Sequence, residues 1–178
     1  MTLASGLSRA DADARQTEPF DTLFGQHYAV IYAVLFRLTG ERAEAEDLAQ
    51  ETFLRLYDAL RDSQRIDNVG GWLYRVATRL GYNALRAARR RAGYEQAAAE
   101  PEQARTPDPA EELAHAEQRR LVRTALAQLP PQQAQLLVLR HSGLSYKELA
   151  GVLGVAPASV GTLLARAEQA FGACYVET

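Results

Sequence analysis

The sequence predicts an all-α protein of two small helical domains joined by a flexible linker, with a helix-turn-helix in the C-terminal domain. Apolar residues recur at helical spacing along most of the 178 residues, and strand-like alternation is almost absent. One stretch, residues 93–112, changes to Ala, Glu, Gln and Pro and separates the two periodic regions. We therefore expect a disordered tail over 1–18, an N-terminal domain over 19–92 and a C-terminal domain over 113–178.

The N-terminal domain is predicted to contain three helices. The first begins at Phe20 behind a proline and ends at Gly40, which suits a helix C-terminal cap. The second runs from about Ala43 to Leu60, and acidic residues in its first turns complement the helix dipole. The third follows a polar loop. Its expected inward face consists of Val69, Trp72, Leu73, Val76, Leu80 and Ala84.

The linker is too poor in large apolar side chains to offset the entropy of ordering it, so we expect it to be flexible. Four helices are expected after it, the first over about Leu113–Leu129 and the second over Pro131–His141. Ser145 and Glu148 then form the Ser-x-x-Glu capping box that opens a short third helix.

A glycine turn and a longer helix complete a helix-turn-helix pattern. Gly154 breaks the short helix, and Pro157 stands where the first turn of the next helix tolerates proline. We interpret this pair as a DNA-binding unit. The alternative is an ordinary helical hairpin with no role in DNA binding.

Charge is distributed unevenly along the chain. The net charge is −2, but residues 118–178 hold six basic and three acidic residues, whereas residues 93–117 hold one and seven. Between Trp72 and Arg91 there is no acidic residue and there are six arginines: Arg75, Arg79, Arg86, Arg89, Arg90 and Arg91. Such a flank favours phosphate binding, with Trp72, Tyr74 or Tyr82 as surfaces on which unpaired bases could stack. The alternative is a solvated arginine face with Trp72 in the core.

The sequence gives little support for a disulfide-stabilised, metal-binding, enzymatic or membrane protein. Cys174 is the single cysteine, so no internal disulfide can form, and the three histidines lack metal-ligand spacing. No nucleophile–base pair is evident, so we expect no enzyme activity, no metal and no cofactor. The N-terminus lacks a signal peptide, and no segment is long and apolar enough for membrane insertion, so we expect a cytoplasmic protein.

Three ordered motifs resemble the sigma-70 family of RNA polymerase sigma factors. Asp47–Arg55 (DLAQETFLR) resembles the core-polymerase-binding motif, and Trp72–Ala77 (WLYRVA) resembles the region that melts the −10 element. Leu129–Gln133 (LPPQQ) and Gly143–Ala150 (GLSYKELA) resemble the start of the −35-binding domain. The resemblance covers about residues 20–172 and is closest to the extracytoplasmic-function (ECF) group, which has only these two domains.

The resemblance implies a role for each motif. The residues expected to dock on the clamp helices of the largest polymerase subunit are Asp47, Leu48, Ala49, Gln50, Glu51, Leu54 and Arg55. Those expected to bind the −10 element, including a flipped base in the loop 64–70, are Gln64, Asp67, Asn68, Trp72, Arg75, Arg79, Asn83, Arg86, Arg89 and Arg90. Those expected at the −35 element are Ser145, Tyr146, Lys147, Ala158, Ser159, Gly161, Thr162 and Arg166.

The last helix departs from the family pattern. Where these factors usually carry Thr-Val-Lys-Ser-Arg, residues 159–163 read Ser-Val-Gly-Thr-Leu, which leaves Arg166 as the only basic residue of that helix. In the −10 region, Arg79 replaces a common asparagine and Asn83 replaces an aspartate. We therefore expect weak binding to the −35 element, and we expect initiation to depend more on contacts with the −10 element.

The resemblance implies a transcription initiation factor whose partners are core RNA polymerase, promoter DNA and an anti-sigma protein that covers the acidic face and the arginine flank. Two alternatives remain: a helix-turn-helix regulator that acts without polymerase, and a sigma-like interaction protein with degenerate −35 reading.

Overall fold

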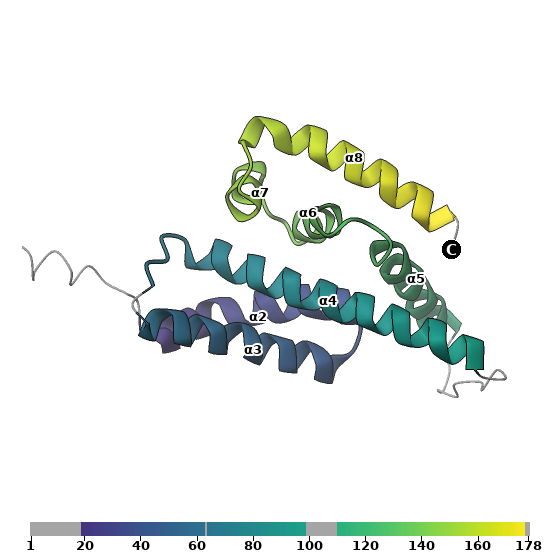
Figure 1. Cartoon of the computed structure of the whole chain (residues 1–178), viewed down its shortest axis with the longest axis horizontal. Helices are drawn as coiled ribbons and strands as arrows, with labels where there is room; N and C mark the ends of the chain where they lie inside the picture. Colours follow the sequence, from purple (N-terminus) through teal and green to yellow (C-terminus); the bar gives the residue numbers. More distant parts are fainter. Residues whose placement is uncertain (1–18, 63, 99–109, 177–178) are drawn as a thin grey trace, which may run out of the picture.

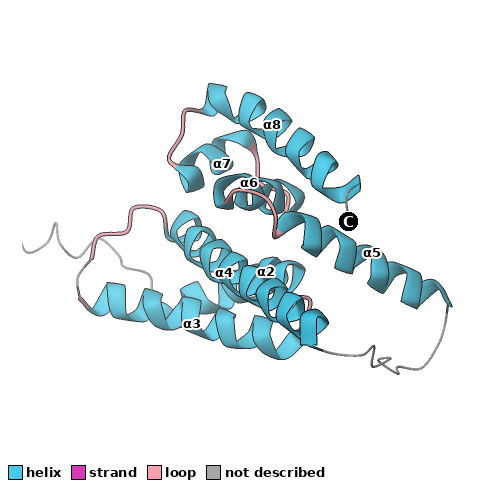
Figure 2. Cartoon of the chain, turned by 45° about the vertical axis from the view of Figure 1, so that its right-hand side comes forward, coloured by secondary structure: helices cyan, strands magenta, loops and turns pink. Residues whose placement is uncertain are grey.

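The computed structural model describes residues 19–62, 64–98 and 110–176, and the side chains of 94–98 and 110–115 are not described. All regular structure in these ranges is helical, as predicted (Figure 2). The helices are α2 (Phe20–Thr39), α3 (Arg42–Arg61), α4 (Val69–Ala98), α5 (Ala110–Leu126), α6 (Pro131–His141), α7 (Tyr146–Leu153) and α8 (Pro157–Val176). The expected N-terminal tail and the middle of the expected linker lie outside the described residues.

Helices α2, α3 and α4 form one bundle. Its core surrounds Phe53, with Ile31 and Leu35 from α2 and Leu73 from α4. Helix α2 ends at Gly40, which has a left-handed backbone (φ 77°) and donates its N–H to Phe36 O. This confirms the predicted stop after Thr39.

Helices α6, α7 and α8 surround a second core that contains Leu139, Leu149 and Val160. The capping box of α7 is formed as predicted: Glu148 N donates to Ser145 Oγ, and Ser145 N donates to a Glu148 carboxylate oxygen at 2.8 Å. Gly154 ends α7 with φ 69°, and α8 leaves at a bend of 88°. The helix-turn-helix geometry therefore follows from local sequence signals.

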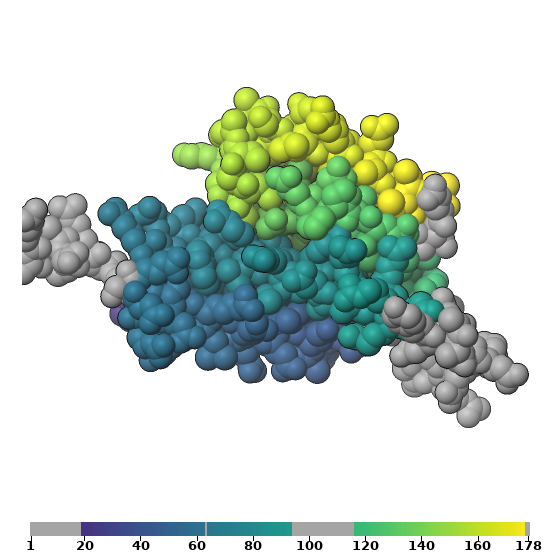
Figure 3. All heavy atoms as spheres, viewed as in Figure 1, coloured from purple at the N-terminus to yellow at the C-terminus, as the bar shows by residue number. Residues whose placement is uncertain are grey.

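The two bundles are packed against each other, with α4 between them (Figure 1). A third apolar cluster joins them, and Figure 3 shows the contact as continuous on the face that it presents. The cluster contains Val34, Leu38, Tyr82 and Leu85 from the first bundle. Its other members are Leu126 at the end of α5, Ala127 and Leu129 in the following turn, and Ala134 and Val138 of α6.

The inward face of α4 differs from the prediction. Leu73, Ala77 and Leu85 are buried, whereas Val76 and Leu80 are only partly buried. Sequence periodicity assumes one buried face, but α4 contacts α2 and α3 on one side and α6 and α7 on the other. Helix α4 also continues to Ala98, inside the segment expected to be a linker.

Among the described residues, no single helix is long and apolar enough to cross a membrane. Only α7 and α8 taken together, across their 88° bend, reach the necessary length and hydropathy.

Candidate functional site

One face of α3 exposes the polar residues of the first motif. Asp47 and Gln50 are exposed, and Glu51 is paired with Arg55 at 2.5 Å. Leu54 lies beside them with 63% of its surface exposed. These side chains lie at i, i+3, i+4 and i+7 spacing and therefore form one surface.

Two residues of the same motif do not belong to that surface. Ala49 is fully buried in the first core, and Leu48 is half-buried against it. Both side chains pack inside the first bundle and add little to the exposed surface of α3. Tyr57, which sequence analysis did not select, is 48% exposed and meets the ring of Phe20 edge-on at 5.5 Å. Tyr57 follows Leu54 by three residues, and this helical spacing could have placed it on the same surface from the sequence alone.

The loop before α4 is fixed by Asn68. Gly71 N donates to Asn68 Oδ1 at 2.8 Å, so this side chain caps the first turn of α4. The amide lies over Gly71, where a Cβ would come within 2.9 Å of Asn68 Nδ2, and this close approach accounts for glycine there. Asp67 pairs with Arg65 at 2.9 Å, and both are exposed, as is Gln64.

The arginine flank of α4 is exposed, and one of its arginines also contacts the other domain. The exposed residues are Arg75, Arg79, Asn83, Arg86, Arg89 and Arg90. The guanidinium of Arg75 donates from Nε to Val152 O at 2.8 Å and from Nη2 to Gly151 O at 3.1 Å. These two carbonyls belong to the last turn of α7, in the other domain.

The aromatic side chains of α4 are less accessible than their sequence pattern indicated. Tyr82 is 4% exposed and its hydroxyl donates to Leu129 O, so the expectation that it could stack on a base is wrong for this structure. Burial raises the pKa of the Tyr82 hydroxyl above its ordinary value. Tyr74 is half-buried and contacts all three apolar clusters, and Trp72 is half-buried against the first core.

The first helix of the helix-turn-helix presents Tyr146 and Lys147. Tyr146 is 46% exposed, and the guanidinium of Arg140 lies 5.5 Å from its ring centroid, within the range of a cation–π contact. Ser145 is exposed, but its hydroxyl and backbone N–H are both engaged with Glu148. That hydroxyl is therefore occupied by the capping box.

The second helix, α8, exposes a small and nearly neutral surface. Ala158, Ser159, Thr162 and Arg166 are exposed, and Gly161 is half-buried. A Cβ at Gly161 would meet only Tyr146 Cε2, at 3.8 Å, which is ordinary van der Waals contact. Packing therefore gives no reason for a glycine here.

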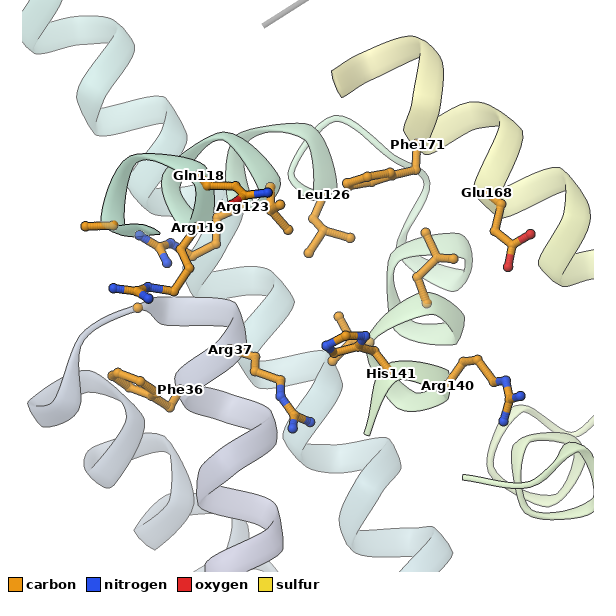
Figure 4. Close-up of a pocket in the computed structure, with 15 residues that line it drawn as sticks. Phe36, Arg37, Gln118, Arg119, Arg123, Leu126, Arg140, His141, Glu168 and Phe171 are labelled. Carbon is orange, nitrogen blue, oxygen red and sulfur yellow. The ribbon is translucent and has the colours of Figure 1, made fainter. Parts of the chain in front are cut away.

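A cavity of about 1250 Å³ lies at the boundary between the domains. Figure 4 shows Phe36 and Arg37 from α2 on one side and His141 and Arg140 from α6 on the other, with Arg119 and Arg123 from α5. Burial lowers the pKa of Arg123, and the nearby Arg119 lowers it further, while Glu41 acts in the opposite direction. The cavity lining therefore gathers arginines from both domains, together with the carboxylate of Glu168 from α8.

Two family models match the chain: sigma-70 region 2 over residues 23–91 and sigma-70 region 4 over residues 119–171. The ECF RNA polymerase sigma factor SigL of Mycobacterium tuberculosis is 33% identical over 170 residues, covering 92% of this chain and 90% of that protein. The ECF RNA polymerase sigma factor SigE of Mycolicibacterium smegmatis is also 33% identical, over 169 residues; the alignment covers 90% of this chain but only 63% of SigE.

Solved structures show the same fold. The sigma factor RpoE from Bartonella quintana, in complex with the anti-sigma factor NepR, aligns with a TM-score of 0.54 and 22% identity over 87% of this chain and 95% of that one. CnrH, in complex with the cytosolic domain of CnrY, aligns with a TM-score of 0.57 and 22% identity over 92% of both chains.

Proposed function

Since this chain belongs to the ECF group of sigma-70 family RNA polymerase sigma factors, we propose how its surfaces divide the work of initiation. The family directs RNA polymerase to promoters and is not enzymatic. We assign polymerase docking to the α3 face, −10 strand capture to the α4 flank and its preceding loop, and −35 binding to α7 and α8. The observation that carries this division is the order of three separate surfaces along a chain that matches both sigma regions.

Docking on the polymerase clamp helices is assigned to Asp47, Gln50, Glu51, Leu54 and Arg55. The support is their exposure as one mixed polar and apolar surface. An exposed leucine surrounded by charged residues fits an interface in which an apolar centre is enclosed by a polar rim. Tyr57 extends the apolar part of this surface.

Strand capture is assigned to Gln64, Asp67 and the exposed arginines of α4. The exposed polar groups of the loop can hydrogen-bond the edge of an unstacked base, and unstacking one base costs a few kcal/mol. The arginines offset this cost by binding phosphates. Asn68 contributes indirectly, because its side chain holds the first turn of α4. No chemistry on DNA is required, and we propose none for this chain.

The −35 element is assigned to the surface of Tyr146, Lys147, Ser159, Thr162 and Arg166. Only Lys147 and Arg166 carry positive charge there, so we propose that this contact is weak. By analogy with the sigma factor RpoE solved with the anti-sigma factor NepR, we also propose that a partner of that kind restrains this chain, in the cytoplasm where promoters are read.

The test is run-off transcription together with core binding. Replacing Gln50 with alanine, or reversing Glu51 to lysine, should reduce core affinity by about fivefold or more, as for a residue central to an interface. Gln26→Ala is the matched control, because Gln26 is exposed on α2, outside the proposed surface. If folded Gln50→Ala and Glu51→Lys variants bind core as the wild type does, the docking surface is wrong. A chain that binds duplex DNA tightly but never binds core would instead act as an independent helix-turn-helix regulator.

A further inference from the structure

The cavity at the boundary between the domains combines an apolar wall with a few charged groups, as small-molecule sites do. We propose that it binds a small amphipathic monoanion, a carboxylic acid with an apolar chain or ring, whose carboxylate contacts Arg119 and Arg123 of α5. The proposal goes beyond the proposed function and does not rest on it. The cavity is lined from α2, α5, α6 and α8, and its lining includes none of the residues assigned above to polymerase or DNA.

Arg123 is a half-buried cation without an acceptor in the described part of the chain. Its side chain forms no hydrogen bond and no ion pair with any described residue. Burial lowers its pKa, and the attraction of Glu41, which lies beyond ion-pair distance, does not reverse this effect. A guanidinium carries five N–H donors, and removing it from water without an acceptor costs free energy. Groups held at such a cost are concentrated at binding sites.

The end of α2 makes room for this guanidinium. A Cβ at Gly40 would lie 2.5 Å from Arg123 Cζ, so a side chain at position 40 would displace the guanidinium from its place. Both residues line the cavity. The glycine that ends α2 therefore also allows Arg123 to lie at the cavity wall.

The charge of the lining is predominantly positive. Four arginines line the cavity, Arg37, Arg119, Arg123 and Arg140, and none of them forms an ion pair with a described residue. Arg119 lies near enough to Arg123 to lower its pKa further. Glu168 also belongs to the lining, but Figure 4 shows it on the opposite side of the cavity from Arg119 and Arg123. An anion bound at these two arginines would offset their mutual repulsion.

The rest of the wall is mostly apolar. Its larger members are Val122, Leu126, Leu137, Val138 and Phe171, and Figure 4 shows Leu126 and Phe171 next to each other. Val122 and Leu126 follow Arg119 and Arg123 by three residues, so the apolar wall adjoins the two arginines on one face of α5.

This arrangement favours a carboxylate over a phosphate. A carboxylate accepts two parallel N–H bonds from one guanidinium, and its single charge matches the one half-buried arginine. A phosphate monoester carries about −1.5 to −2 charges at neutral pH and costs more to remove from water. The volume of about 1250 Å³ leaves room for a hydrocarbon chain along the apolar wall.

Calorimetric titration of the full chain with dodecanoate, below the concentration at which it forms micelles, tests the site. Arg123→Gln should weaken binding by about tenfold or more, because a hydrogen bond between charged groups is lost. Arg119→Gln, at an exposed position, tests the same contact if Arg123→Gln does not fold. Arg120→Gln is the matched control. Arg120 lies on the same helix, pairs with Glu117 at 2.6 Å and does not line the cavity, so this variant should bind as the wild type does.

A ligand series tests the two parts of the site separately. Affinity should fall by about threefold for each methylene removed from dodecanoate to octanoate. Dodecyltrimethylammonium has the same chain with the opposite charge, and inorganic phosphate is an anion without a chain; both should bind at least about tenfold more weakly than dodecanoate.

Three results would overturn the proposal: no binding of dodecanoate, equal binding by the Arg119→Gln and Arg120→Gln variants, or equal binding of dodecanoate and dodecyltrimethylammonium. The second and third would show that apolar contact alone holds the ligand. Inorganic phosphate binding as tightly as dodecanoate would equally overturn the role of the apolar wall. None of these measurements involves polymerase or DNA, so failure here is distinguishable from failure of the proposed function.

Discussion

At the scale of single residues, a substitution at Gly161 can distinguish general affinity for DNA from recognition of its base sequence. It is half-buried on α8, where a Cβ would have room, 3.8 Å from Tyr146 Cε2. We expect Gly161→Lys to tighten binding to duplex DNA of any sequence, because a phosphate contact carries no base information. The slope of log affinity against log salt should steepen by about 0.9. Binding of the variant to matched and scrambled −35 duplexes over a salt series measures both effects.

Gly172→Lys is the control for that experiment. Gly172 lies in the same helix, is exposed and has nothing near its Cβ position, so lysine there gives a comparable gain in helix propensity of about 1 kcal/mol. It should leave DNA binding unchanged. A gain for Gly161→Lys that is confined to the matched duplex would mean that position 161 reads bases.

At the scale of one element, α7 depends on the charge of its capping residue. Hydrogen bonds from the Ser145 side chain and backbone lower the pKa of the Glu148 carboxyl below its ordinary value. A depressed carboxyl pKa stabilises the folded state above the unfolded-state pKa, and this contribution is lost as the pH falls through the folded-state pKa. We therefore expect Glu148→Gln to be less stable than the wild type at neutral pH, and the difference to be smaller at about pH 3.5, below the ordinary glutamate value of about 4.3.

Urea unfolding of the full chain at the two pH values measures this difference. Glu168→Gln on α8 is the control, because Glu168 is exposed and has no hydrogen-bond partner in the described part of the chain. The difference in stability between Glu168→Gln and the wild type should not shrink in this way at the lower pH. An equal stability gap for Glu148→Gln at both pH values would show that the carboxylate charge adds nothing to the cap.

At the scale of the whole molecule, the contact between the two bundles combines apolar burial with hydrogen bonds. The Tyr82 hydroxyl donates to Leu129 O, and both residues are buried. We expect Tyr82→Phe to lower the free energy of unfolding by about 1–3 kcal/mol, because the buried carbonyl of Leu129 then lacks this donor. Urea unfolding of the full chain measures this change, and an unchanged midpoint would show that the bond adds nothing to the contact.

Local sequence determined most of the helices, several of their ends and the main exposed surfaces of this protein, although it did not predict that α4 continues to Ala98. The stop at Gly40, the capping box of Ser145 and Glu148, and the turn at Gly154 are each set by residues within four positions of one another. Short-range hydrogen bonds and backbone preferences act at that range, so the sequence alone predicts them. The exposed face of α3 was likewise predictable, from helical spacing together with the family motif.

Only the tertiary structure decided what covers α4. The partners of Thr78 and Arg75 lie 57 and 77 residues away, and the prediction that Tyr82 is accessible was wrong because Leu129 covers its hydroxyl. Helical periodicity shows which side of a helix is apolar. It does not show whether water, DNA or another domain pairs with the hydrogen-bonding groups of a polar side chain. The choice among these depends on how two bundles dock, and docking is set by shape and charge distributed over both domains.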